Sequence, residues 1–331
     1  MSLRFVPYER SAAIPNIIVD GTANAATVLT LSHWRRSGTP VELASDTSAE
    51  IVFKYLDAPR FHVEAEAVSN NHFDEDGLIG VFALTQPGIA LQHRELLIDA
   101  AQAGDFGFYR DRNAARIAFV ISAYADPETS PLPKSIFRLP YPELAAELYR
   151  EVLNVMPTLL GDIQAYRALW DEEDRKLTES EKLIGEGIVT IEEQPELDLA
   201  IIRIPNTLTA SRVHRFTQSR SVECHPFAIH NQTMRSRLLL LKGDDVEFQY
   251  RYESWVRMTS RRPALRVDLT SLTEELTRED GKANWVFEGV DRIVPRLYRK
   301  GTGPSGIDLR RFIDLLEREL RTGMAAWNPY D

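Results

Sequence analysis

The sequence has almost no cysteine and no long hydrophobic run. Cys224 is the single cysteine among 331 residues, so no disulfide can form within the chain, and we expect a reducing cytoplasmic location. Apolar runs such as Leu238–Leu241 are far shorter than the roughly 20 residues of a membrane-spanning helix. Residues 1–15 lack the apolar stretch of a signal peptide. We therefore expect no membrane association.

The sequence also has fewer basic residues than acidic ones. Lysine and arginine number 39 against 49 aspartate and glutamate residues, which gives a net charge of −10. Such a balance argues against non-specific binding to duplex DNA. The sequence has no Gly-x-Ser-x-Gly motif, and Cys224 beside His225 does not make a convincing catalytic dyad. A hydrolase built on a serine or cysteine nucleophile is therefore disfavoured.

The pattern of apolar residues predicts an α/β protein of two domains. In the first part, short buried runs alternate with helical patterns, which is typical of a parallel sheet. After Gly185, strand patterns dominate and a closing amphipathic helix is expected at 307–320. We predict a parallel-sheet domain over residues 1–183, which includes bridging helices, and a smaller α+β domain over 184–331 for substrate binding or regulation.

One stretch stands out for its chemistry, His72-Phe73-Asp74-Glu75-Asp76-Gly77. It follows a short apolar run that predicts a buried strand, and a packed helix is expected from Leu78. In an extended backbone, alternate residues point the same way, so His72, Asp74 and Asp76 could converge on one point. Such a group is costly unless a cation neutralises it.

Three interpretations of this stretch compete. It could be a solvated acidic turn, since Asp and Gly are common in loops. An EF-hand loop fails, because its first position is His72 and its twelfth is Ala83 rather than Glu. A transition-metal site with histidine and aspartate ligands fits best.

The stretch also resembles a known motif. His72-x-Asp74-x-Asp76-Gly77 is similar to the HxDxDG motif at a strand end in the DHH phosphoesterase superfamily. That resemblance implies a hydrolase of phosphodiester or phosphoanhydride bonds with two manganese ions, or magnesium in their place.

The resemblance extends to three earlier segments and one later one. Asp20 ends an apolar run, and His33 lies at a second expected strand end, although a helix over 23–31 fits equally well. Thr47 and Glu50 form a capping box that opens a helix with the Ser-Ala-Glu start of the family. Asp105 resembles the last metal motif, with Asp99 as a competing carboxylate.

The sequence departs from the family pattern in two ways. Leu31-Ser32-His33-Trp34 stands in place of the DHH triplet and keeps one histidine, and this segment precedes the HxDxDG stretch instead of following it. The resemblance thus implies a permuted sheet in which His72 and Asp74 hold one metal ion. Asp76, His33 and Asp105 would hold the second, with Asp20 as the bridge and Asp74, Asp76 and His72 as the catalytic residues.

The C-terminal part carries a local excess of basic residues. We expect its basic residues to face a phosphorylated small molecule or short nucleotide, because guanidinium groups bind phosphate well. The alternative is that they pair with the abundant acidic residues. The family's glycine-histidine motif is absent. The candidate substrate-binding residues are Arg261, Arg262, His225 and His230.

The leading hypothesis is therefore a manganese-dependent phosphoesterase. The alternative is a non-catalytic relic of that fold, which binds a nucleotide or a protein partner in the cleft between the domains. The missing triplet supports this alternative. Neither the substrate nor the oligomeric state follows from the sequence.

Overall fold

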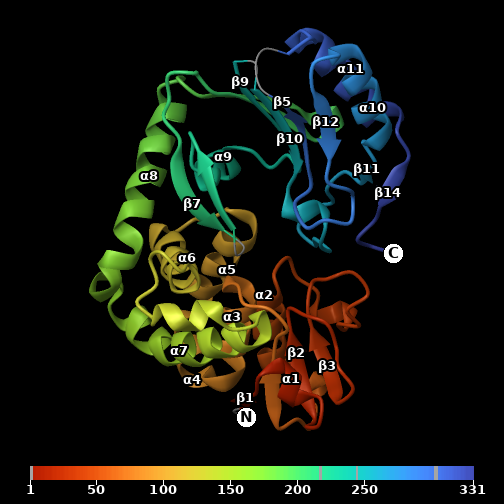
Figure 1. Ribbon diagram of the computed structural model, residues 1–331. Helices are drawn as coiled ribbons and strands as arrows, with labels where there is room; N and C mark the ends of the chain where they lie inside the picture. The colour runs from red at the N-terminus through yellow and green to blue at the C-terminus, as the bar shows by residue number, and fades with distance from the viewer. Residues whose placement is uncertain (1–2, 216–217, 244, 302–304) are drawn as a thin grey trace. The chain divides into compact units, whose positions relative to one another are not determined.

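The protein is described by a computed structural model covering residues 3–215, 218–243, 245–301 and 305–331. It has the mixed α/β fold that the sequence predicts, with a parallel sheet in its N-terminal part (Figure 1). The chain forms two compact units. Unit 1 comprises Met1–Thr178 and Ser211–Phe227, and unit 2 comprises Glu179–Ala210 and Ala228–Asp331.

The sheet of unit 1 has four parallel strands in the order β1-β4-β2-β3. Because the strands are parallel, all of them end at the same edge. The two central strands, β2 and β4, are short and wholly buried. Because both of their faces are covered, their sequences are mostly apolar and do not alternate with polar residues. The strands are β1 Arg4–Phe5, β2 Asn16–Val19, β3 Thr27–Leu31 and β4 Ala67–Ser69.

Helices make up most of the rest of unit 1. The chain crosses from β3 to β4 through α2, and α3 follows β4 directly. α3 packs against α2, α5 and the sheet, and ten of its eleven residues are buried. These helices are α1 Tyr8–Ser11, α2 Ser48–Asp57, α3 Glu75–Thr85, α4 Pro87–Ala90, α5 Arg94–Phe106, α6 Arg112–Ala125 and α7 Tyr141–Gly161. α8 Arg167–Gly185 begins in unit 1, and its residues from Glu179 onward belong to unit 2.

Two helix starts position the site. Thr47 caps α2 by accepting a hydrogen bond from Glu50 N, as the capping box predicts. Asp74 caps α3 in the same way, through Gly77 N. The helix that the sequence predicts from Leu78 therefore begins earlier, at Glu75, because Asp74 caps it. Asp76 lies in the first helical turn rather than in a loop.

A β-hairpin from the middle of the chain completes unit 1. It consists of β7 Ser211–Arg215 and β8 Gln218–Val222. Arg212 pairs with Asp126, the buried residue after α6, at 2.5 and 2.7 Å. Our predicted boundary at 183 did not include this return, because the pairing is not visible in local sequence patterns.

Unit 2 contains a six-stranded sheet in the order β12-β13-β10-β9-β6-β5, in which β6 and β9 are parallel and the other pairs antiparallel. α10 Thr270–Asp280 and α11 Leu309–Thr322 share its apolar core. α9 Pro226–Gln232 contains the division between the units. The six strands are β5 Thr190–Gln194, β6 Leu199–Arg203, β9 Arg237–Lys242, β10 Asp245–Tyr250, β12 Asn284–Phe287 and β13 Arg296–Lys300. A separate antiparallel pair is formed by β11 Arg266–Val267 and β14 Ala325–Trp327.

Within the described part of the chain, no helix is both long enough and apolar enough to cross a membrane.

Candidate metal centre

Three neighbouring strands deliver polar side chains to one edge of the sheet. Asp20 follows β2 directly, His33 is the second residue after β3, and His72 lies in the segment after β4. Asp20 has a positive φ of 48°, a conformation that Asp tolerates better than most residues and that turns the chain sharply at the strand end. Ligand sites in open α/β sheets lie at this carboxyl edge.

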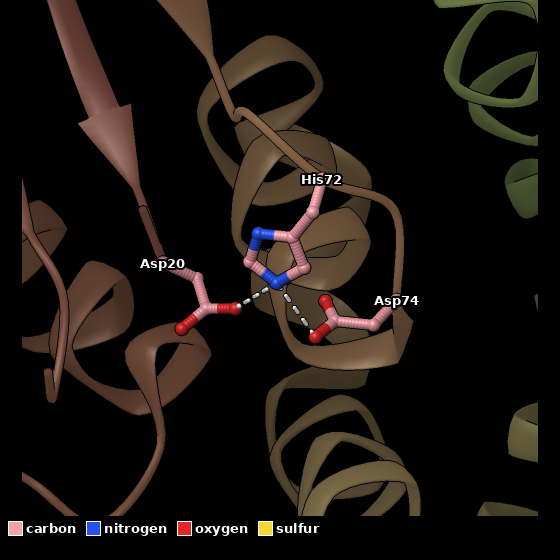
Figure 2. Close-up of side chains that lie close together, drawn as sticks. All are labelled: Asp20, His72 and Asp74. Atoms are coloured by element: carbon pink, nitrogen blue, oxygen red, sulfur yellow. Dashed lines mark hydrogen bonds and ion pairs between the residues drawn. The ribbon is translucent and has the colours of Figure 1, made fainter. Parts of the chain in front are cut away.

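The first group of side chains consists of Asp20, His72 and Asp74. The His72 ring lies between the two carboxylates, with Nε2 3.2 Å from Asp20 Oδ2 and 2.9 Å from Asp74 Oδ2 (Figure 2). One ligand atom from each residue lies within 4.8 Å of the others. The spacing of His72 and Asp74 in the sequence therefore does bring them together.

The second group consists of Asp20, His33 and Asp76 and is fully buried. His33 Nε2 lies 3.3 Å from Asp20 Oδ1 and 3.9 Å from Asp76 Oδ2. Asp20 thus belongs to both groups and uses a different oxygen in each. The sequence-based hypothesis gave Asp20 this shared position.

Asp105 joins the second group from α5. Its Oδ2 lies 3.6 Å from His33 Nε2, and the side chain is almost completely buried. The competing carboxylate, Asp99, lies nearly two turns earlier in the same helix and makes different contacts. It accepts hydrogen bonds from the backbone N–H groups of Arg110 and Asp111 and so fixes the connection to α6. Asp105, not Asp99, is therefore the later residue of the cluster.

The first turn of α2 holds the second group in place. Asp76 accepts hydrogen bonds from Ser48 N and Ala49 N, both at 2.7 Å. The Ser48 hydroxyl donates to Asp20 Oδ1 at 2.7 Å and accepts from His33 N at 3.2 Å. The partial positive charge of a helix N-terminus favours carboxylates here. Ser48 was not among the predicted site residues, although the Thr47 capping box indicated that a helix begins at this position.

The imidazole of His33 has a fixed orientation. Its Nδ1 lies 2.5 Å from the backbone carbonyl of Asp46, which makes Nδ1 the protonated nitrogen of a neutral ring. In that neutral ring, Nε2 carries the lone pair that could ligate a cation, and it faces the carboxylates of Asp20 and Asp76. This is the usual arrangement of a metal-ligating histidine.

Two glycines leave room for the segment before His72. A Cβ at Gly21 would lie 2.3 Å from Asn71 Oδ1, and one at Gly77 would lie 2.1 Å from Asn70 Nδ2. Asn70 Oδ1 in turn accepts a hydrogen bond from His72 N at 3.0 Å. Gly21, after the turn at Asp20, and Gly77, in the first turn of α3, are therefore both required for close packing.

The pKa values of the cluster reflect crowded negative charge. Burial raises the pKa of Asp76 to about 7, and the charge on Asp20 adds to this effect. Burial and then the Asp76 charge raise the pKa of Asp105 well above its usual value. Burial opposes ionisation of Asp20 too, but hydrogen bonds with His33 and His72 outweigh it and lower its pKa.

The histidines respond in the opposite sense. Burial disfavours the charged ring of His72, yet the charges and hydrogen bonds of Asp74 and Asp20 raise its pKa well above the usual value. The pKa of His33 is raised as well, because Asp20 and Asp76 outweigh burial. The cluster therefore favours bound positive charge.

These donors fit divalent cations. Two imidazole nitrogens and four carboxylates are ligands that manganese, iron and zinc accept, and a cation would take the place of the protons that the cluster favours. Nothing in the donor set selects manganese over the others. The buried groups of aspartate and histidine can thus hold a metal ion.

The candidate substrate-binding residues have partners of their own. In unit 1, His225 Nε2 lies 3.0 Å from Glu173 Oε1. In unit 2, Arg261 pairs with buried Glu253 at 3.0 Å, and the Arg262 guanidinium lies 4.6 Å from the centre of the Tyr330 ring. His230 is buried in α9. These contacts agree with the alternative that the basic residues pair within the protein.

Fold and site together define an α/β protein with a buried aspartate–histidine cluster, able to hold a metal ion, at the carboxyl edge of a parallel sheet. The chain belongs to a family described as a family of unknown function (DUF6687), whose model matches residues 1–331. No curated protein and no solved structure significantly matches the chain.

Proposed function

We propose that this protein is a metal-dependent hydrolase of phosphoric esters or anhydrides. The observation that carries the proposal is the pair of ligand groups that share Asp20, one completed by His72 and Asp74 and the other by His33 and Asp76. When bound, two divalent cations, for which we propose manganese, would activate a water molecule and neutralise charge on a phosphoryl group.

The residues of the cluster would have different roles in this reaction. Ser48 and the first turn of α2 hold Asp20 and Asp76 so that their charges remain where the cations bind. Asp20 faces both histidines and would serve both cations.

Access is limited to one side of the cluster. The side chains of His72 and Asp74 are 23% and 10% exposed, whereas Asp20, His33 and Asp76 are 0% exposed. A substrate phosphate would therefore approach over His72 and Asp74, and its charge would be attracted by the bound cations. The substrate class we propose is a phosphorylated small molecule or a short nucleotide.

The test is metal binding followed by hydrolysis. We expect the wild type to bind two manganese ions per chain in a calorimetric titration. With manganese present, it should hydrolyse bis-p-nitrophenyl phosphate, short oligonucleotides or cyclic dinucleotides. Asp74→Asn and Asp105→Asn should each lower metal affinity, because each replaces a carboxylate of the cluster with a neutral amide that binds cations more weakly.

Asp99→Asn is the matched control, because Asp99 is a buried carboxylate on the same helix as Asp105, but its contacts are with the backbone N–H groups of Arg110 and Asp111 and the Arg110 guanidinium. It should bind metal as the wild type does. Stoichiometric metal without hydrolysis of any of these substrates would favour the binding relic. A wild type that binds no metal would end the proposal.

A further inference from the structure

The two histidines of the centre differ in how their rings are held. His33 donates Nδ1–H to a backbone carbonyl, the common device for orienting a ligating imidazole. The Nδ1 of His72 is buried too, but it has no hydrogen-bond partner among the residues that the structure describes. The orientation of the His72 ring therefore depends on the contacts of its Nε2 with Asp20 and Asp74 and on what packs against the ring.

An aromatic ring lies against His72 instead. Trp34 stacks on it with ring centroids 5.3 Å apart and an angle of 24° between the planes. Trp34 is half-buried and directly follows His33, so its backbone is anchored at the same strand end. Its N–H donates to Ser32 Oγ at 3.1 Å, and Ser32 N donates to Thr39 Oγ1 at 2.8 Å.

The loop after β3 is thus braced on both sides of Trp34. Thr39 Oγ1 also donates toward the carbonyls of Thr30 and Ser32, at 2.9 and 2.8 Å. These bonds tie the far end of the loop back to the strand. The indole is therefore presented by a fixed backbone rather than by a free loop.

We propose that Trp34 is a positioning residue for the first metal ligand group. Its ring limits rotation of His72 about the side-chain bonds and holds Nε2 between the carboxylates of Asp20 and Asp74. This inference rests on the proposed metal site and adds a specific claim. One centre contains two orienting devices, a backbone carbonyl for His33 and an indole for His72.

Loss of the Trp34 ring should affect only one of the two ligand groups. Loss of the stack should weaken the group of Asp20, His72 and Asp74 while leaving the group of Asp20, His33 and Asp76 intact. Loss of an outer partner of a ligating histidine costs about tenfold to a hundredfold in metal affinity. The conservative replacement Trp34→Phe keeps an aromatic face and should keep the site.

The experiment is a manganese titration by calorimetry of four proteins: the wild type, Trp34→Leu, Trp34→Phe and Trp255→Leu. Trp255 is the matched control, since it is also half-buried and stacked, on Trp327 in unit 2 at 5.7 Å. We expect Trp34→Leu to lose one of two binding events, or to weaken it about tenfold or more. Trp34→Phe and Trp255→Leu should keep both events. Circular dichroism would check that each variant is folded.

A second readout does not depend on metal. The His72 ring protons should shift in NMR spectra of Trp34→Leu, because the indole ring current is removed. Two binding events of wild-type strength in folded Trp34→Leu would overturn the positioning role and leave the proposed function standing. Loss of one event in both Trp34→Leu and Trp34→Phe would also overturn it. A wild type that binds no manganese would overturn both proposals.

Discussion

Asp76 takes part in folding and in the candidate site through the same two oxygens. Both accept hydrogen bonds from the first turn of α2, and one also faces His33. Asp76 lies in the first turn of α3 and not in a loop, so its carboxylate contacts the packed start of α2 as well as the candidate site. Asp74 differs, because only its Oδ1 serves the fold, as the cap of α3.

This difference predicts different costs for the same substitution. Asp76→Asn places an amide N–H against a backbone N–H and should lower the free energy of unfolding by about 1–3 kcal/mol. Asp74→Asn should cost less than about 1 kcal/mol, since Asn caps helices nearly as well as Asp. Urea unfolding followed by circular dichroism measures both. Equal costs for the two variants would contradict the assignment.

Some residues of the candidate site could be predicted from the sequence, and others could not. Asp20 and His72 could be predicted as partners because each follows an apolar strand, and parallel strands end at one edge. Ser48 and Trp34 could not, since a serine at a helix start and a tryptophan in a loop have many ordinary roles. Their importance depends on which side chains lie opposite, and that is a property of the folded chain.

At the scale of elements, α3 is the piece on which the site depends. Its Gly80 lies against the sheet and α2: a Cβ there would be 2.5 Å from Val19 Cγ1 and 3.3 Å from Val52 Cγ2. Asp76 is one turn earlier on the same helix. Close packing at Gly80 therefore sets the depth at which the Asp76 carboxylate meets α2.

Gly80→Ala should destabilise the protein by about 1–3 kcal/mol, because the added methyl overpacks the contact between α3 and β2. It should also weaken metal binding by moving Asp76. Gly161→Ala in α7 is the control, since a Cβ there meets no atom within 4 Å. That change should be neutral or stabilise the helix by up to about 1 kcal/mol. Thermal unfolding would compare the two; a Gly80→Ala protein as stable as wild type would show that α3 can shift freely.

Element boundaries were less predictable than the elements. The capping box at Thr47 gave the start of α2 correctly. The start of α3 was placed too late, because Asp74 acts as a helix cap while also belonging to a ligand pattern. Asp74 fits both the pattern of a helix cap and the pattern of a metal ligand, so the sequence alone does not show that it is the cap.

At the scale of the whole molecule, the six residues of the cluster, Asp20, His33, His72, Asp74, Asp76 and Asp105, all belong to unit 1. A ligand that binds only the folded state stabilises the part of the protein that forms its site. Bound metal should therefore act unequally on the two units.

We expect this difference in hydrogen exchange with manganese compared with EDTA. At a manganese concentration about 100 times the Kd, unit 1 should gain about 2.7 kcal/mol of stability. Peptides covering β2, β4 and α3 should exchange more slowly, while those covering β9, β10 and α11 should be unchanged. Magnesium and calcium are useful comparisons. Protection confined to unit 2 would rule out the assigned site.

The fold class of both units was predictable, because alternating apolar runs report strands and helices locally. The division of the chain was not. The return of Ser211–Phe227 to unit 1 depends on contacts such as that between Arg212 and Asp126, which are 86 residues apart. A contact between residues so far apart cannot be predicted from the local sequence pattern.

The return of Ser211–Phe227 to unit 1 affects when that unit can be completed during synthesis of the chain. Synthesis proceeds from the N-terminus, yet unit 1 lacks the Arg212 partner of Asp126 until the β7–β8 hairpin has left the ribosome. By then residues 179–210 of unit 2 have already emerged, although most of that unit has not. Neither unit is therefore a continuous cassette that could be cut out or exchanged between genes. A fragment that ends at residue 183 would carry the whole cluster of cation ligands but leave Asp126 without its guanidinium.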